Sequence, residues 1–146
     1  MSQRIAAVAG LLLVLAACGG DGGRAKAEWI AGAEAICARV NGEIDALGDA
    51  DSLAEIAEYA AKVRKIAERQ LADLANLDAP EHDRETIRAM LAFIAEGIEK
   101  TEQVESAARK GDAGRTFEIV DEIESLTAEA NRTARDYGLE ECAGVT

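Results

Sequence analysis

The chain has 146 residues, with 16 lysines and arginines against 28 aspartates and glutamates, so its formal net charge is -12 at pH 7. This length suits one domain. Alanine is the commonest residue, aromatic residues make up 3%, and there is a single proline. This composition favours helices and argues against a β-sandwich, a barrel or a parallel-sheet enzyme. The acidic balance also argues against nucleic acid as a partner, because affinity for a phosphate backbone comes from cationic side chains.

The N-terminus has the pattern of a secretory signal peptide. Arg4 is the only charged residue in the first 17, and it precedes the apolar run Ile5–Ala17, which only Gly10 interrupts. As a helix this run would reach about 20 Å, short of a bilayer core of roughly 30 Å. We therefore expect residues 1–17 to be a signal peptide and not a membrane span.

The apolar run ends at Leu15-Ala16-Ala17-Cys18-Gly19, which resembles the bacterial lipobox. The resemblance implies diacylation of the Cys18 sulfur, cleavage before Cys18 and acylation of the new amino group. Each buried acyl CH₂ contributes about 0.8 kcal/mol, so two or three chains anchor a protein firmly. We expect a lipid anchor on the extracytoplasmic side of the cell membrane, or on the outer membrane of a diderm cell. The alternative is an ordinary signal peptide that is cut elsewhere.

A glycine-rich segment, Gly19-Gly20-Asp21-Gly22-Gly23, follows the lipobox. Such a composition favours neither helix nor strand and is typical of a flexible linker. We expect residues 18–24 to be the lipidated cysteine and a tether, followed by a folded domain over residues 25–146.

Two cysteines, Cys37 and Cys142, remain once Cys18 is assigned to lipid. An even pair in an oxidising compartment favours a disulfide. Closing a loop of about 100 residues would contribute roughly 4 to 5 kcal/mol in the chain-entropy model. The alternatives are two free thiols or a metal pair, although two thiolates alone do not complete a tetrahedral site.

Apolar residues recur at steps of three and four along four segments, which predicts four amphipathic helices. The expected helices cover Ala25–Leu47, Leu53 to about Leu77, Pro80–Arg109 and Asp112–Tyr137. Ser52-Leu53-Ala54-Glu55 has the capping-box pattern of a helix start. The short connections predict an all-α, up-down-up-down four-helix bundle stapled by one disulfide. Because its seam is largely alanine, we expect little room for a large apolar ligand cavity.

The residue types in this sequence do not fit the catalytic and cofactor sites that are common in helical bundles. The chain has one histidine, His82, and lacks the Glu-x-x-His pairs of a di-iron site and the Cys-x-x-Cys-His of covalent haem. His82 and Met90 lie on one predicted helix and cannot face each other across a haem iron. We expect no catalytic residues, no metal site and no cofactor.

Two features of the sequence could contribute to a binding site. Gln70 interrupts the seam of the second helix and is expected to make a polar contact inside the bundle, with Thr101 or with water, that fixes the register of the helices. The second feature is a carboxylate-dense stretch that could bind cations weakly or face a basic partner, although such a run is more often a solvated helix face. Its members are Glu96, Glu99, Glu102, Glu105, Glu118, Asp121, Glu122 and Glu124.

The segments 33–39 and 136–142, each carrying one of the paired cysteines, with Ala79-Pro80 between them, resemble those of small secreted actinobacterial proteins and lipoproteins. The resemblance implies an all-helical scaffold and an extracytoplasmic compartment. It supplies no functional residue beyond the cysteines.

The sequence thus predicts a membrane-anchored, non-enzymatic lipoprotein that binds an envelope protein or peptide. The alternative is a lipoprotein that binds a small molecule or a divalent cation through its acidic helix faces or a polar gap near Gln70. An enzyme is the least favoured interpretation.

Overall fold

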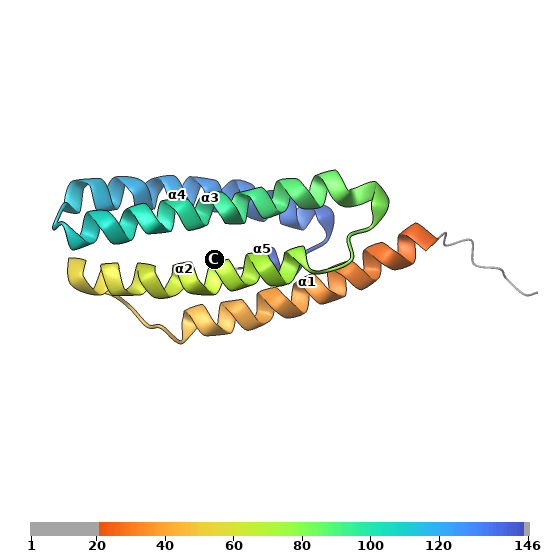
Figure 1. The fold of residues 1–146 in the computed structure, drawn as a ribbon, viewed down its shortest axis with the longest axis horizontal. Helices are drawn as coiled ribbons and strands as arrows, with labels where there is room; N and C mark the ends of the chain where they lie inside the picture. Colours follow the sequence, from red (N-terminus) through yellow and green to blue (C-terminus); the bar gives the residue numbers. More distant parts are fainter. Residues whose placement is uncertain (1–20, 145–146) are drawn as a thin grey trace, which may run out of the picture.

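The computed structural model describes residues 21–144, and this part of the chain is all-helical with four long helices packed together (Figure 1). Its elements are α1 (Asp21–Asp45), α2 (Leu53–Ala75), the 3₁₀ turn η1 (Glu81–Asp83), α3 (Arg84–Arg109), α4 (Ala113–Tyr137) and the short α5 (Glu140–Ala143). The expected all-α bundle with one disulfide is confirmed at this level. The predicted signal peptide and Cys18 lie outside the described residues.

The start of α2 is set by the predicted capping box. The Ser52 hydroxyl oxygen accepts a hydrogen bond from the backbone N–H of Glu55 at 3.3 Å. The Glu55 carboxylate accepts from the Ser52 hydroxyl at 2.9 Å and from the backbone N–H of Asp51 at 3.0 Å. The hydrogen bond from Ser52, followed by that from Asp51, lowers the pKa of Glu55. The unpaired Glu55 N–H of the first turn and the Asp51 N–H just before the cap are both satisfied in this way.

Two helix starts differ from the prediction. The predicted tether is wrong over residues 21–24, which form the first turn of α1. Glycine disfavours a helix by about 1 kcal/mol, but tertiary contacts override such preferences. A methyl group on Gly22 would stand 3.9 Å from His82 Cδ2, so this turn lies against η1. The third helix begins at Arg84 and not at Pro80, because a 3₁₀ turn intervenes, as is common at helix N-termini.

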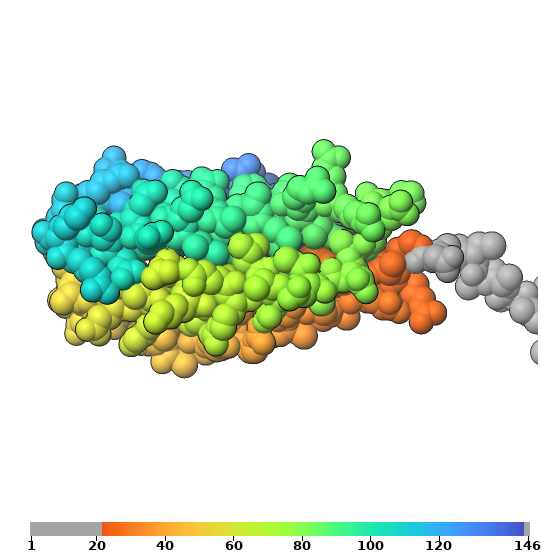
Figure 2. Space-filling model, in the orientation of Figure 1, coloured from red at the N-terminus to blue at the C-terminus, as the bar shows by residue number. Residues whose placement is uncertain are grey.

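The apolar core has two clusters. The larger one contains residues from all four long helices and from the C-terminal segment: Trp29, Ala33, Leu74, Ile87, Met90, Ala134, Tyr137, Leu139 and Ala143. The smaller one contains Ala60 of α2, Val104 and Ala107 of α3, and Ile119 of α4. Side chains of α2 and α3 meet along most of their length on the face shown in Figure 2. The two clusters lie at different levels along the bundle, since the larger one contains Leu74 of α2 and the smaller one contains Ala60 of the same helix.

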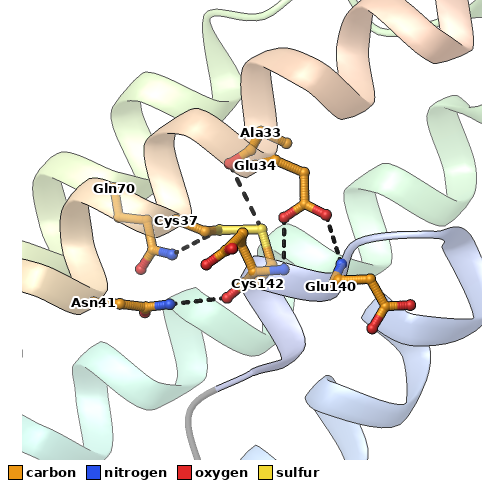
Figure 3. The surroundings of a disulfide bond; sticks show 8 residues. Ala33, Glu34, Cys37, Asn41, Gln70, Glu140 and Cys142 are labelled. Atoms are coloured by element: carbon orange, nitrogen blue, oxygen red, sulfur yellow. Dashed lines mark hydrogen bonds between the residues drawn. A yellow bond between two sulfur atoms is a disulfide. The ribbon is translucent and has the colours of Figure 1, made fainter.

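The C-terminal segment is bound into the gap between α1 and α4. Gly138 ends α4 with φ 101°, a left-handed conformation that glycine adopts without strain, and the chain turns into α5. Cys142 of α5 then forms the predicted disulfide with Cys37 of α1, with an S–S distance of 2.08 Å (Figure 3). Because α5 packs against both α1 and α4, this bond connects the first and last long helices.

Glu34 supplies the N-terminal cap that α5 lacks in its own sequence. Its carboxylate accepts hydrogen bonds from the backbone N–H groups of Glu140 at 2.6 Å and Glu141 at 2.7 Å (Figure 3). Asn41, one helical turn past the disulfide, donates to the Glu141 carbonyl at 2.9 Å. Negative charge at a helix N-terminus is favourable. The disulfide is therefore flanked on both sides by hydrogen bonds that hold α5 on α1.

The end of α4 also contacts the start of α1 directly. The rings of Trp29 and Tyr137 meet edge to face with centroids 5.6 Å apart, and the Lys26 ammonium lies 4.1 Å from the Tyr137 ring centre. The Tyr137 hydroxyl donates to Asp83 at 2.8 Å. Burial, followed by this hydrogen bond, raises the pKa of Tyr137 above its ordinary value. Tyr137 thus joins α1, η1 and α4.

Replacing both cysteines tests the disulfide. We expect Cys37→Ala/Cys142→Ala to lower the free energy of unfolding by about 2 to 5 kcal/mol, because the unfolded chain regains the freedom of a long loop. Urea denaturation followed by circular dichroism measures this. Dithiothreitol should destabilise the wild type to a similar degree and leave the double variant unchanged. Equal stability of the two proteins without reductant would contradict the assignment.

Tyr137 predicts an alkaline dependence of stability. Its pKa is higher in the folded than in the unfolded protein, so its contribution is complete below the unfolded value of about 10 and is lost as the pH rises above that. We expect the free energy of unfolding to fall above this pH, and to fall less in Tyr137→Phe. At neutral pH this variant should be less stable by about 1 kcal/mol, the loss of one hydrogen bond. Parallel slopes for the two proteins in alkaline urea titrations would show that Tyr137 does not titrate with unfolding.

Candidate functional site

The bundle is incomplete at one end. The larger core cluster draws on all four long helices, whereas the smaller one draws on α2, α3 and α4 and on no α1 residue among those the structure describes. α1 ends at Asp45, short of the end where α2 begins, and the chain crosses to α2 through the connection 46–52 (Figure 1). Within this connection Gly48 has φ 72°, which allows the turn. The position beside α2 and α4 that a fourth helix would occupy is therefore open.

An apolar groove of about 420 Å³ lies at this open position. Its floor is the end of α3, with Thr101 and Val104. Its other lining residues come from two facing helices and the connection: Ile56, Tyr59, Ala60 and Val63 of α2, Phe117, Val120 and Ile123 of α4, and Gly48, Asp49 and Ala50. The groove is thus bounded by three helices and one loop.

Large apolar side chains are left accessible along the groove. Phe117 is 56% exposed, and among the described residues it is the one large hydrophobic side chain that is classed as exposed. Ile56, Val63 and Val120 are only half-buried, whereas Leu74 of α2 and Ala134 and Tyr137 of α4 are buried at the other end. The Thr101 hydroxyl donates to the Gly97 carbonyl of its own helix at 2.7 Å, so it adds little polarity to the floor. An open, apolar-walled groove of this kind is typical of a binding site.

The groove overturns the expectation of little interior room. Small alanine side chains do bring the helices together, as at Ala60 and Ala107 in the smaller cluster. The space arises because the fourth helix is missing at this level. Ile56, Phe117 and Ile123 lie on the apolar stripes of their helices, which predicts core positions for them, whereas Tyr59 lies off the stripe of α2.

Carboxylates surround the mouth of the groove. Asp49 lines it, and Glu55 lies one helical turn before the lining residue Tyr59. On the opposite wall Asp121 and Glu124 follow Phe117 and Val120 by four residues and so share their side of α4. All four carboxylates are exposed, and none forms an ion pair with another described residue.

An adjoining small hollow extends this acidic rim along α2. It is lined by Asp49, Glu58 and Lys62 together with Tyr59. Lys62 is the one cation among the lining residues of the groove and this hollow. The rim consists of five carboxylates (Asp49, Glu55, Glu58, Asp121 and Glu124), of which Asp49, Glu55 and Glu58 line the groove or the hollow together with Lys62. A ligand with cationic groups around an apolar surface would match it in charge.

The rest of the predicted carboxylate-dense stretch is partly neutralised. Glu122 accepts a hydrogen bond from Lys100 at 2.7 Å, which, with the nearby Arg115, lowers its pKa. Arg115 also pairs with Glu118 at 2.8 Å, and Glu105 pairs with Arg109 at 2.8 Å. No group of three or more histidine, cysteine, aspartate or glutamate side chains within the described chain is arranged to hold a metal ion.

Gln70 and Thr101 are not brought together. Gln70 Nε2 lies 3.6 Å from Cys37 Sγ (Figure 3), whereas Thr101 lines the groove. Gln70 instead faces a hollow of about 80 Å³ beside the disulfide, which Trp29 and Asn131 also line. The buried Trp29 indole N–H has no hydrogen-bond partner among the described residues. This hollow has room for water but not for a metabolite.

Comparisons with known proteins supply no function. No family model matches the chain, and neither a curated protein nor a solved structure is similar enough to be matched. Among the described residues, no helix is long and apolar enough to cross a bilayer. The groove is therefore interpreted from its own geometry and charge.

A pair of substitutions on α4 tests whether the groove wall contributes to the free energy of unfolding as the core does. We expect Phe117→Ser to change the free energy of unfolding by less than about 0.5 kcal/mol, because the side chain is mostly exposed. Ile119→Ala, two residues along the same helix and 1% exposed, should cost about 2 to 5 kcal/mol. Urea denaturation measures both. A similar large loss for Phe117→Ser would mean that the groove wall is part of the folding core.

Proposed function

We propose that this protein is a lipid-anchored, extracytoplasmic binding module, without enzymatic activity, that holds a protein or peptide partner in the groove between α2 and α4. The observation that carries the proposal is the open position of the bundle at this end. Apolar side chains on α2 and α4 remain accessible there, while the same helices contribute the buried Leu74, Ala134 and Tyr137 to the larger cluster at the other end. A partner that fills this position would bury them and gain the hydrophobic free energy that the isolated chain forgoes.

The lipobox supports the location. Residues 1–17 have the pattern of a signal peptide and Cys18 that of a lipidated residue. The Cys37–Cys142 disulfide fits an oxidising compartment, where such bonds persist. The alternation of helix direction along the bundle is part of the proposal, and the short connections between helices support it.

The groove suits a site presented away from the membrane. Only residues 19 and 20 separate Cys18 from the first described residue of α1. The groove lies at the far end of α1, since the connection that follows this helix lines it. A helix of 25 residues is about 37 Å long. A lipid anchor at the start of α1 would therefore leave the groove facing a partner in the envelope.

A small apolar molecule is the second candidate ligand. The groove volume of about 420 Å³ falls within the usual range of small-molecule sites. The acidic rim has no role in holding such a ligand, which is why a partner with cationic groups ranks first. A cation site has no geometric support in the described residues.

Metabolic labelling tests the anchor. Cells that produce the full chain are grown with an alkyne-bearing fatty acid, and the protein is recovered from the membrane fraction. We expect the wild type to carry the label and Cys18→Ala to lose both label and membrane association, because the sulfur is the site of acylation. Cys37→Ala/Cys142→Ala controls for the loss of cysteine as such and should keep the label. A labelled Cys18→Ala protein would refute the anchor.

A further inference from the structure

We infer that the partner of the groove is a basic amphipathic helix, whose apolar face lies between α2 and α4 and whose lysine or arginine side chains reach the acidic rim. This inference rests on the proposed function and specifies the chemistry of the partner. It follows from three properties of the groove: its place in the bundle, the spacing of its walls and the charge around its mouth.

The groove occupies a helix-shaped place. α2 and α4 both pack on α3, and at the other end of the bundle the space beside them is filled by α1 and α5. At the groove end the corresponding space has no occupant among the described residues. An added helix would therefore complete the four-helix packing that this chain completes itself at the other end.

The spacing of the walls matches one face of a helix. On α2 the lining residues extend from Ile56 to Val63, and on α4 from Phe117 to Ile123. At 1.5 Å per residue these walls are about 9 to 11 Å long. Apolar side chains at positions i, i+3 or i+4, and i+7 of a partner helix cover about the same length, which is the usual pattern of a helix seated in a groove.

The rim selects for positive charge. Its five carboxylates, Asp49, Glu55, Glu58, Asp121 and Glu124, stand on both sides of the mouth, and Lys62 is the one cation among the residues that line the groove and the adjoining hollow. The chain as a whole carries a net charge of -12. Exposed charges interact over about 8 Å at physiological ionic strength, so cations flanking the apolar face of a bound helix would be attracted and would associate faster.

The same charges disfavour the other occupants. A second copy of this chain would bring another acidic protein to an acidic rim. A lipid headgroup with a phosphate would be repelled, and an uncharged acyl chain would make no use of the carboxylates. The proposed cleavage before Cys18 leaves three residues ahead of α1. Three residues span at most about 11 Å, whereas α1 is about 37 Å long and the groove lies beyond its far end, so this remnant is too short to reach the groove.

Two labelled model peptides test the inference. Both form the same amphipathic helix with leucines at i, i+4 and i+7; one carries lysines and arginines around this face and the other glutamates. The full chain is embedded in phosphatidylcholine nanodiscs, and empty nanodiscs serve as the blank for fluorescence anisotropy. We expect saturable one-to-one binding of the basic peptide, with the acidic peptide at least tenfold weaker and the basic affinity falling as salt is added.

Matched double variants of α4 locate the site. Asp121→Asn/Glu124→Gln should lower the affinity for the basic peptide three- to tenfold and make this affinity less dependent on salt. Glu129→Gln/Asp136→Asn removes the same charge from exposed positions of the same helix beyond the groove and should leave binding unchanged. Phe117→Ser should lower the affinity for the basic peptide, because the apolar face of the peptide loses a contact, without changing the salt dependence of binding. Circular dichroism confirms that each variant is folded.

The outcomes separate the inference from the proposed function. Equal affinity for both peptides, or equal losses in the two double variants, would overturn the basic helix but keep the groove as a binding site. Saturable binding of a fluorescent fatty alcohol with no peptide binding would replace the helix by a small apolar ligand. A dimer in sedimentation that Phe117→Ser dissociates would replace it by a second copy. Binding of none of these probes, with a monomeric protein, would overturn both.

Discussion

The attachment of the C-terminal segment to α1 is the constraint on which the structure depends. The Cys37–Cys142 bond joins residues 105 positions apart, and the Glu34 carboxylate caps the turn of α5 that carries the second cysteine. A covalent bond and a charged hydrogen-bonding group thus hold the same four residues of α5. They fix the first and last long helices relative to each other, and α2 and α3 complete the core between them.

The other end of the bundle lacks a comparable contribution from α1 among the described residues. α1 is held where it contacts α5, and its 25 residues end at Asp45, before the level of the smaller core cluster. The chain then needs the connection 46–52 to reach the start of α2. Because α1 ends there, α2, α3 and α4 have no fourth helix beside them at this level among the described residues. The groove thus lies at the opposite end of the bundle from the disulfide.

Local features were predictable because neighbours along the chain determine them. The four helices follow from apolar spacing, the start of α2 from Ser52 and Glu55, and the end of α4 from Gly138. The tether prediction failed over residues 21–24, because contact with η1 supports helix there despite the glycines. Gln70 lies 3.6 Å from the Cys37 sulfur, on another helix and 33 residues away, which no spacing within one helix encodes.

The residue pattern alone therefore establishes the helical class, the helix boundaries to within a turn or so, and the pairing of Cys37 with Cys142. These properties depend on periodicity, capping and the count of thiols, all of which can be read along one dimension. The groove depends on how far one helix is displaced along its neighbours, which periodicity does not encode. A stripe that contains Ile56 or Phe117 looks the same whether or not a fourth helix covers it, and only the packing in three dimensions leaves it open.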